Sequence, residues 1–227
     1  ECETVENRPH KAGRKRGDTV VMVARETREA ILSGRLAIGQ RLVESDLTRE
    51  FGVGRSSVRE AIRQLSSEGL VEIIPHRGAV VRRLTRAEVI DRYQIREVLE
   101  GLAARLVAAR ISDPAIRQGL LKAFSADPEG SIAEHRRRNY RLHGAIADLS
   151  GNAQLAALIR QLWLPAVMSE LREELGWAHW RQSETEHQAI IEAILAGDGE
   201  AAEARMRVHL RQGAARIKAL PARVFGL

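Results

Sequence analysis

Three features are scarce in this sequence, and each absence excludes a class of protein. Cys2 is the only cysteine among 227 residues, so no disulfide forms within the chain and a reducing compartment is expected. No apolar run approaches the roughly 20 residues that span a bilayer, and the polar, basic N-terminus lacks the apolar core of a secretory signal. Aromatic residues make up only 4%, which favours helices over sheets. We therefore expect a mainly α-helical, cytoplasmic protein without a membrane anchor.

The sequence does contain enough apolar residues, 44% of the chain, to build two cores. A chain of 227 residues suits two domains, since domains commonly have roughly 100–150 residues. Residues 1–83 carry 16 Lys and Arg against 12 Asp and Glu, whereas residues 84–227 carry 20 against 18. The smaller N-terminal segment thus holds most of the positive excess, as a nucleic-acid-binding domain would.

The hydrophobic periodicity predicts two domains of different kinds. Residues 1–17 have no periodicity and predict a flexible basic tail. Residues 18–84 predict a winged helix-turn-helix, and residues 85–220 predict an all-helical bundle. Helices are expected from residue 18 to Gly34, then over 43–51, 56–68, 86–111, 114–124, 131–149, 153–175, 177–196 and 199–220. Branched apolar runs at 70–74 and 79–83 predict a hairpin, the wing, around Pro75-His76-Arg77-Gly78.

The predicted helix over 56–68 has the two faces that a DNA-reading helix needs. Ser57 and Glu60 have the spacing of an N-terminal capping box. One face carries three arginines spaced four residues apart, with Ser56 near its start: Arg55, Arg59 and Arg63. The other face carries an apolar stripe formed by Val58, Ala61, Ile62 and Leu65. Arginine can pair bidentately with guanine or with phosphate oxygens. The alternative is a solvated arginine face balanced by Glu60 and Glu68.

The segment LVESDLTREFGVGRSSVREAIRQLSSEGLVEIIPHRGAVV resembles the DNA-binding module of GntR-type regulators. The resemblance covers about forty residues in fixed order. It implies that Arg55 and Arg59 contact DNA and that His76, Arg77 and Gly78 form the wing tip. The sequence departs from the family pattern at Gly54, where Ser or Thr is usual. It also has Ser45 near the position where many members carry a further DNA-contacting arginine.

Four polar residues of the helical half are the candidate ligands of a metal site. Asn139 and His143 are four residues apart on one predicted helix, and His187 and His209 lie on the last two helices. Three imidazoles and one oxygen suit Zn²⁺ or a similar first-row ion. The alternative is three surface histidines or satisfied core histidines. His135, one turn before Asn139, is expected at the solvent edge.

Residues 86–211 resemble the FCD ligand-binding domain of the FadR-type branch of GntR regulators. The matching pieces are Ile95-Arg96-x-x-Leu99-Glu100, Leu142-His143 followed by Gly151-Asn152, Glu186-His187-x-x-Ile190, and His209-Leu210. In that group an Asp and three His hold a divalent metal, and a carboxylate effector completes its shell. The resemblance therefore implies zinc, with nickel and manganese as other candidates, held by Asn139, His143, His187 and His209. Arg96 is the candidate for the effector carboxylate, with a structural salt bridge to Glu100 as its alternative.

These features predict a homodimeric, sequence-specific DNA-binding regulator, a repressor controlled by a small carboxylate effector. The competing interpretation is a helical metalloenzyme carrying a DNA-binding head, because a three-histidine site with an open position can activate water. Against it, the sequence offers no general acid or base beside the histidines except Glu186, which we expect to point elsewhere. A non-specific structural DNA-binding protein would leave the helical domain unexplained.

Overall fold

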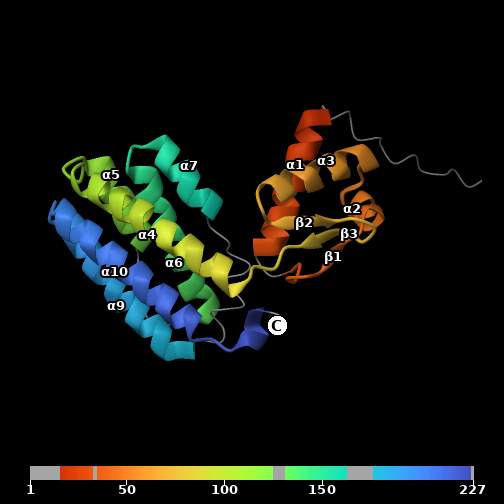
Figure 1. The fold of residues 1–227 in the computed structure, drawn as a ribbon. Helices are drawn as coiled ribbons and strands as arrows, with labels where there is room; N and C mark the ends of the chain where they lie inside the picture. Colours follow the sequence, from red (N-terminus) through yellow and green to blue (C-terminus); the bar gives the residue numbers. More distant parts are fainter. Residues whose placement is uncertain (1–15, 33–34, 125–130, 163–175, 226–227) are drawn as a thin grey trace, which may run out of the picture. The chain divides into compact units, whose positions relative to one another are not determined.

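The computed structural model describes residues 16–32, 35–124, 131–162 and 176–225 (Figure 1). The chain divides into two compact units, with the principal boundary between Arg82 and Arg83. Almost all of the predicted tail, and residues 163–175 of one predicted helix, lie outside the described residues. Within the described ranges, no helix has the length and apolar character needed to cross a membrane.

The N-terminal unit has the winged helix-turn-helix order that the sequence predicted. Its elements are α1 (Arg16–Leu32), β1 (Arg41–Leu42), α2 (Glu44–Phe51), α3 (Arg55–Ser67), β2 (Val71–Ile74) and β3 (Gly78–Val81). The antiparallel sheet has the order β1-β3-β2, with Arg41 opposite Val80 and Ile74 opposite Gly78. Strand β1 was not predicted, because two residues are too few to show an alternating pattern.

Helix α3 packs through the apolar stripe that its sequence predicted. Val58, Ala61 and Leu65 are completely buried, and Ile62 is nearly so. Ala61 packs against Val23 and Ala24 of α1 in one cluster of buried residues. Because one face of α3 is fixed in this core, the opposite face remains in water.

The predicted capping box at the start of α3 is wrong. The helix begins at Arg55, and Gly54 is its N-cap residue with extended backbone (φ −72°, ψ 151°) and no side-chain cap. Ser57 is therefore already inside the first turn, where its helical backbone prevents it from acting as an N-cap. The preceding helix ends at Gly52, whose left-handed backbone (φ 63°) lets its N–H bond to the Thr48 carbonyl.

The C-terminal unit is helical throughout its described part. Its elements are α4 (Arg86–Ala108), α5 (Pro114–Phe124), α6 (Ile132–Leu149), α7 (Ala153–Leu162), α9 (Gly176–Leu195), α10 (Gly199–Lys218) and the 3₁₀ turn η1 (Ala222–Phe225). Helix α4 makes its most extensive contact with α10, α9 lies beside α10, and α5 lies beside α6 (Figure 1). Reciprocal capping boxes start two helices: Thr85 with Glu88 starts α4, and Ser131 with Glu134 starts α6.

Candidate DNA-reading surface and metal centre

The outer face of α3 carries the predicted DNA-contacting side chains. Arg55, Ser56, Arg59 and Arg63 are all exposed, on the side opposite the buried stripe. Arg55 occupies the first position of the helix, where backbone N–H groups are also available to an anion. At the wing tip, His76, Arg77 and Gly78 are likewise exposed.

Acidic residues hold two of the α3 arginines in place. The Arg59 Nε donates to both carboxylate oxygens of Glu44, at 3.0 and 2.8 Å. Arg63 pairs with Glu60 at 3.2 Å on the same helix. Both pairs are exposed to solvent, so each contributes little stability and can exchange for a phosphate contact. The acidic residues therefore neutralise Arg59 and Arg63 only through weak ion pairs.

A hollow of about 370 Å³ lies where the start of α3 meets the wing. It is lined by Arg41, Leu42, Val43, Glu44, Ser45, Arg55, Arg59, Gly78 and Ala79. Arg41 is the residue that sequence reasoning missed, because its place depends on the pairing of β1 with β3. Gly78 has a left-handed backbone (φ 84°), and a Cβ there would lie 3.7 Å from the Arg41 Nε. Three arginines thus line one hollow beside the wing.

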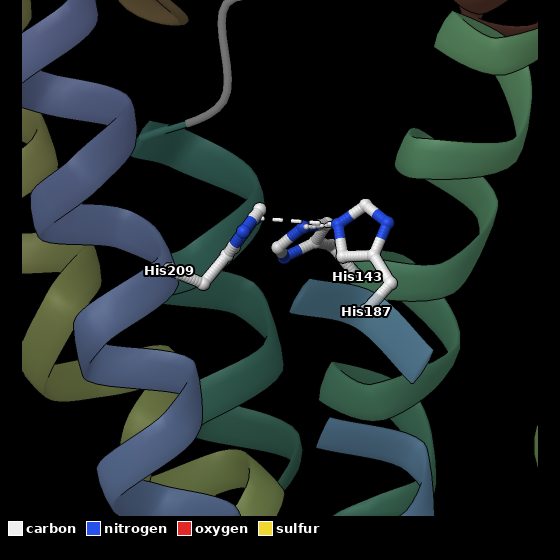
Figure 2. Close-up of side chains that lie close together, drawn as sticks. All are labelled: His143, His187 and His209. Atoms are coloured by element: carbon white, nitrogen blue, oxygen red, sulfur yellow. Dashed lines mark hydrogen bonds between the residues drawn. The ribbon is translucent and has the colours of Figure 1, made fainter. Parts of the chain in front are cut away.

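The helical unit brings His143, His187 and His209 together (Figure 2). They come from α6, α9 and α10, and each is at least 95% buried. The His187 Nε2 lies 3.3 Å from the Nε2 of His143 and 3.3 Å from that of His209. One ligand nitrogen from each ring lies within 4.8 Å of the others. Three helices distant in sequence thus direct imidazole nitrogens at one buried point.

These distances fit a shared metal ion. Two nitrogens bound tetrahedrally to Zn²⁺ at about 2.0–2.1 Å lie about 3.3–3.4 Å apart. Asn139, one turn before His143 on α6, is 4% exposed, and its Oδ1 has no hydrogen-bond partner among the described residues. A buried acceptor without a partner is costly and points to a missing ligand. The residues present therefore fit a divalent ion with nitrogen and amide-oxygen donors.

Two carboxylates, one buried and one half-buried, fix the orientation of two of the histidines. Glu100 of α4 accepts a hydrogen bond from the His143 Nδ1, and Glu186 of α9 accepts one from the His209 Nδ1 at 2.7 Å. Because an ionised carboxylate only accepts, each Nδ1 carries the proton and each neutral ring has its lone pair on Nε2. The expectation that Glu186 points away from the histidines is therefore wrong: it reaches across to the neighbouring helix.

Both carboxylates are held in the ionised form by arginine. Burial alone would raise the pKa of Glu100, but the charge of Arg96 and the hydrogen bonds from His143 and Arg96 outweigh it and hold this pKa well below its ordinary value. Burial would likewise raise the pKa of Glu186, whereas hydrogen bonds from His209 and Arg216 lower it. Each carboxylate charge is therefore already balanced by an arginine.

Arg96 and His135 are both buried. The Arg96 Nε donates to Glu100 at 2.7 Å, and both side chains are buried, so the salt bridge given above as the alternative role of Arg96 is present. The expectation that His135 lies at the solvent edge is wrong, since it is 4% exposed. It stacks on Trp180 and its Nδ1 lies 2.9 Å from Glu184. Helical periodicity predicted the face of the helix on which His135 lies, but it could not predict that α9 covers this side chain.

Replacing Glu100 by Gln is expected to destabilise the metal-free protein by about 3–5 kcal/mol, because it leaves Arg96 buried without its counter-charge. Chemical denaturation in chelator measures this loss. Since the pKa of Glu100 is depressed in the folded state, its contribution is complete above about pH 4.3, the unperturbed value, and declines only below it. Glu97→Gln is the control, because Glu97 forms a more exposed pair with Arg211. Equal losses in the two variants would contradict the prediction.

Family models match both units of the chain. Residues 19–81 match the model described as bacterial regulatory proteins of the gntR family, and residues 91–212 match the FCD domain. The chain is 29% identical over 200 residues to a protein of Paenarthrobacter nicotinovorans named "Probable D-xylose utilization operon transcriptional repressor" (85% of this chain, 87% of that protein). It is 27% identical over 201 residues to the transcriptional repressor RspR of Escherichia coli (84% and 85%).

The fold agrees with these sequence matches. A crystal structure of a GntR transcriptional regulator from Rhodococcus sp. RHA1 superposes with a TM-score of 0.76 at 25% identity, covering 90% of this chain and all of that one. The FCD match alone spans more than half of the chain, and the helix-turn-helix match accounts for most of the remainder. The chain is therefore a member of the GntR family of bacterial transcriptional regulators, with an FCD domain as its C-terminal unit.

Proposed function

We propose that this regulator is a sequence-specific repressor whose DNA binding is controlled by a small carboxylate effector, bound at a divalent metal in the FCD domain. The observation that carries this proposal is the buried convergence of three histidine Nε2 atoms, with the unpartnered Asn139 Oδ1 one turn before His143 on α6. Relatives named as repressors support the direction of regulation. Zinc suits the donor set best, and nickel and manganese are alternatives.

In this proposal, α3 enters the major groove. Arg55 and Arg59 contact base edges or phosphates, with Ser56 and Arg63 beside them on the exposed face. The wing residues His76, Arg77 and Gly78 grip the adjacent backbone. Arg41, lining the same hollow as Arg55 and Arg59, adds a phosphate contact. A homodimer places two such helices on the half-sites of a palindrome.

The charge of the site supports an anionic effector. Asn139 and the three histidines are neutral donors, and the two neighbouring carboxylates are already balanced by Arg96 and Arg216. A bound divalent ion would supply a positive charge that these neutral donors leave unbalanced. A carboxylate balances part of it, and we propose Arg96, which is linked to His143 through Glu100, as the residue that orients that carboxylate.

The effector acts by shifting a population rather than by reacting. It changes DNA affinity only insofar as it binds the DNA-competent and DNA-incompetent arrangements with different affinities. Glu186, the acid or base that an enzyme would need, has both carboxylate oxygens engaged, one by His209 and one by Arg216. We therefore propose that the protein binds and releases its effector without converting it. The test is to incubate metal-loaded protein with candidate organic acids and analyse the mixture for reaction products.

Replacing Arg55 and Arg59 together by Ala is expected to weaken operator binding about 30-fold or more, since each arginine contact contributes about 1–3 kcal/mol. Fluorescence anisotropy with a DNA fragment from the regulated promoter, repeated at several salt concentrations, measures the loss. Arg211→Ala, which removes an exposed arginine of the FCD domain, is the matched control and should bind normally. Undiminished affinity of the double variant would refute the assignment of α3.

Replacing Asn139 by Asp is expected to raise the affinity for Zn²⁺ at least about tenfold without effector, because it adds a negative charge beside the cation. Competition with a chromophoric chelator measures this affinity. Asn152→Asp is the control, since Asn152 caps α7 through its own Oδ1. His143→Ala should lose most of the affinity. If Asn139→Asp and Asn152→Asp bind zinc equally, Asn139 is not a ligand.

A further inference from the structure

The segment that follows α10 contacts the first turn of α4. Leu220 and Phe225 are 7% and 5% exposed. Arg86, the first residue of α4, donates from its Nη2 to the Leu220 carbonyl at 2.6 Å. The same guanidinium lies over the Phe225 ring, with its Cζ 4.9 Å from the ring centroid. One arginine thus holds two points of residues 219–225, which we call the α10 extension.

The first turn of α4 is itself a fixed structure. Thr85 and Glu88 form the reciprocal capping box, with the Thr85 N–H donating to the Glu88 carboxylate at 2.9 Å. Leu84 and Val89 occupy the two positions of a hydrophobic staple on either side of this box, and each is 2% exposed. A contact made within this turn therefore acts on the whole turn.

Very little chain separates this turn from the DNA-reading unit. Strand β3 ends at Val81, and the Arg82 N–H donates to the Leu70 carbonyl of the same unit at 2.9 Å. Arg83 follows, and Leu84, which belongs to the C-terminal unit, is already buried. One residue of extended chain spans at most about 3.6 Å. The position and direction of the first turn of α4 therefore limit the arrangements that are open to the DNA-reading unit.

The α10 extension is also continuous with a helix of the metal centre. Helix α10 carries His209, whose Nδ1 donates to Glu186, and Arg216, which binds the same carboxylate. Beyond the last turn of α10, the Leu220 N–H donates to the Ile217 carbonyl at 3.1 Å, so the backbone stays hydrogen-bonded as far as the residue that contacts α4. Because a packed helix moves as a nearly rigid body, a displacement of His209 reaches Leu220.

We propose that the α10 extension couples occupancy of the metal centre to the DNA-reading unit, and that Arg86 is the positioning residue that transmits this coupling to the start of α4. The proposal rests on the proposed function and names the route by which its metal centre acts. The competing route runs along α4 itself, because α4 begins at Arg86 and also carries Glu100, the partner of His143. The two routes differ in whether Phe225 is needed.

Removing either side chain of the contact tests whether the α10 extension restrains α4. In the metal-free full chain, Phe225→Ala and Arg86→Ala are each expected to speed backbone amide exchange in residues 83–92 at least about fivefold, because the start of α4 loses a contact that opposes its opening. Hydrogen–deuterium exchange followed by mass spectrometry measures the rates. Arg110→Ala is the matched control, since Arg110 donates to the Leu149 carbonyl near the other end of α4 and should leave residues 83–92 unchanged.

Zinc alone tests the coupling. In the wild-type chain, Zn²⁺ is expected to slow amide exchange both in α10 around His209 and in residues 83–92. In Phe225→Ala the zinc affinity, measured by competition with a chromophoric chelator, should stay within about twofold of the wild-type value, because Phe225 is not among the candidate ligands. The protection of α10 should persist in this variant, whereas the protection of residues 83–92 should be lost.

The possible results separate the coupling from the metal site. Zinc-dependent protection of residues 83–92 that survives in Phe225→Ala would overturn the coupling and assign the signal to α4. Unchanged exchange in the metal-free variant, or zinc binding by the wild-type chain without protection of residues 83–92, would also overturn the coupling while leaving the metal centre in place. A wild-type chain that binds no zinc would instead overturn the metal site of the proposed function, and the coupling with it.

Discussion

A buried carboxylate held between two cationic or donating partners is the constraint on which the FCD site depends. Glu100 can remain ionised in the interior only because Arg96 lies beside it on α4 and His143 reaches it from α6. The same arrangement recurs with Arg216, Glu186 and His209 on α9 and α10. Each chain of arginine, glutamate and histidine fixes a proton on Nδ1 and leaves Nε2 facing the centre. The site therefore exists only when four helices are packed together.

The DNA-reading unit follows a simpler rule. Helix α3 is held by one apolar stripe against α1, and this burial leaves its arginines on the outside. Glu44 of α2 accepts a hydrogen bond from the Arg59 guanidinium of α3. In the proposed function Arg59 contacts DNA, and because its pair with Glu44 is exposed and weak, Arg59 can exchange this carboxylate for a phosphate at little cost.

Local sequence patterns predicted the helices and the hairpin well because these elements form mainly from interactions between residues close together in the sequence. The stripe from Val58 to Leu65 predicted α3, and Pro114 marked the first residue of α5. The histidines were found because helical spacing and resemblance to the family both selected them. What the sequence could not supply was register between distant segments. The placement of Arg41 depends on β1 pairing with β3, the reach of Glu186 depends on α9 lying beside α10, and the depth of His135 depends on Trp180 of α9.

Helix α4 carries consecutive residues with opposite surroundings, since Ile95 faces solvent while Arg96 is buried against Glu100. An α-helix rotates about its axis as a nearly rigid body, so its inner and outer residues cannot rotate independently of one another. Any rotation that re-aims the Arg96 guanidinium must therefore sweep Ile95 and Val98 across the opposite surface. The helix that follows the DNA-reading unit in the chain thus couples what happens in the interior of the bundle to whatever lies against its outer side.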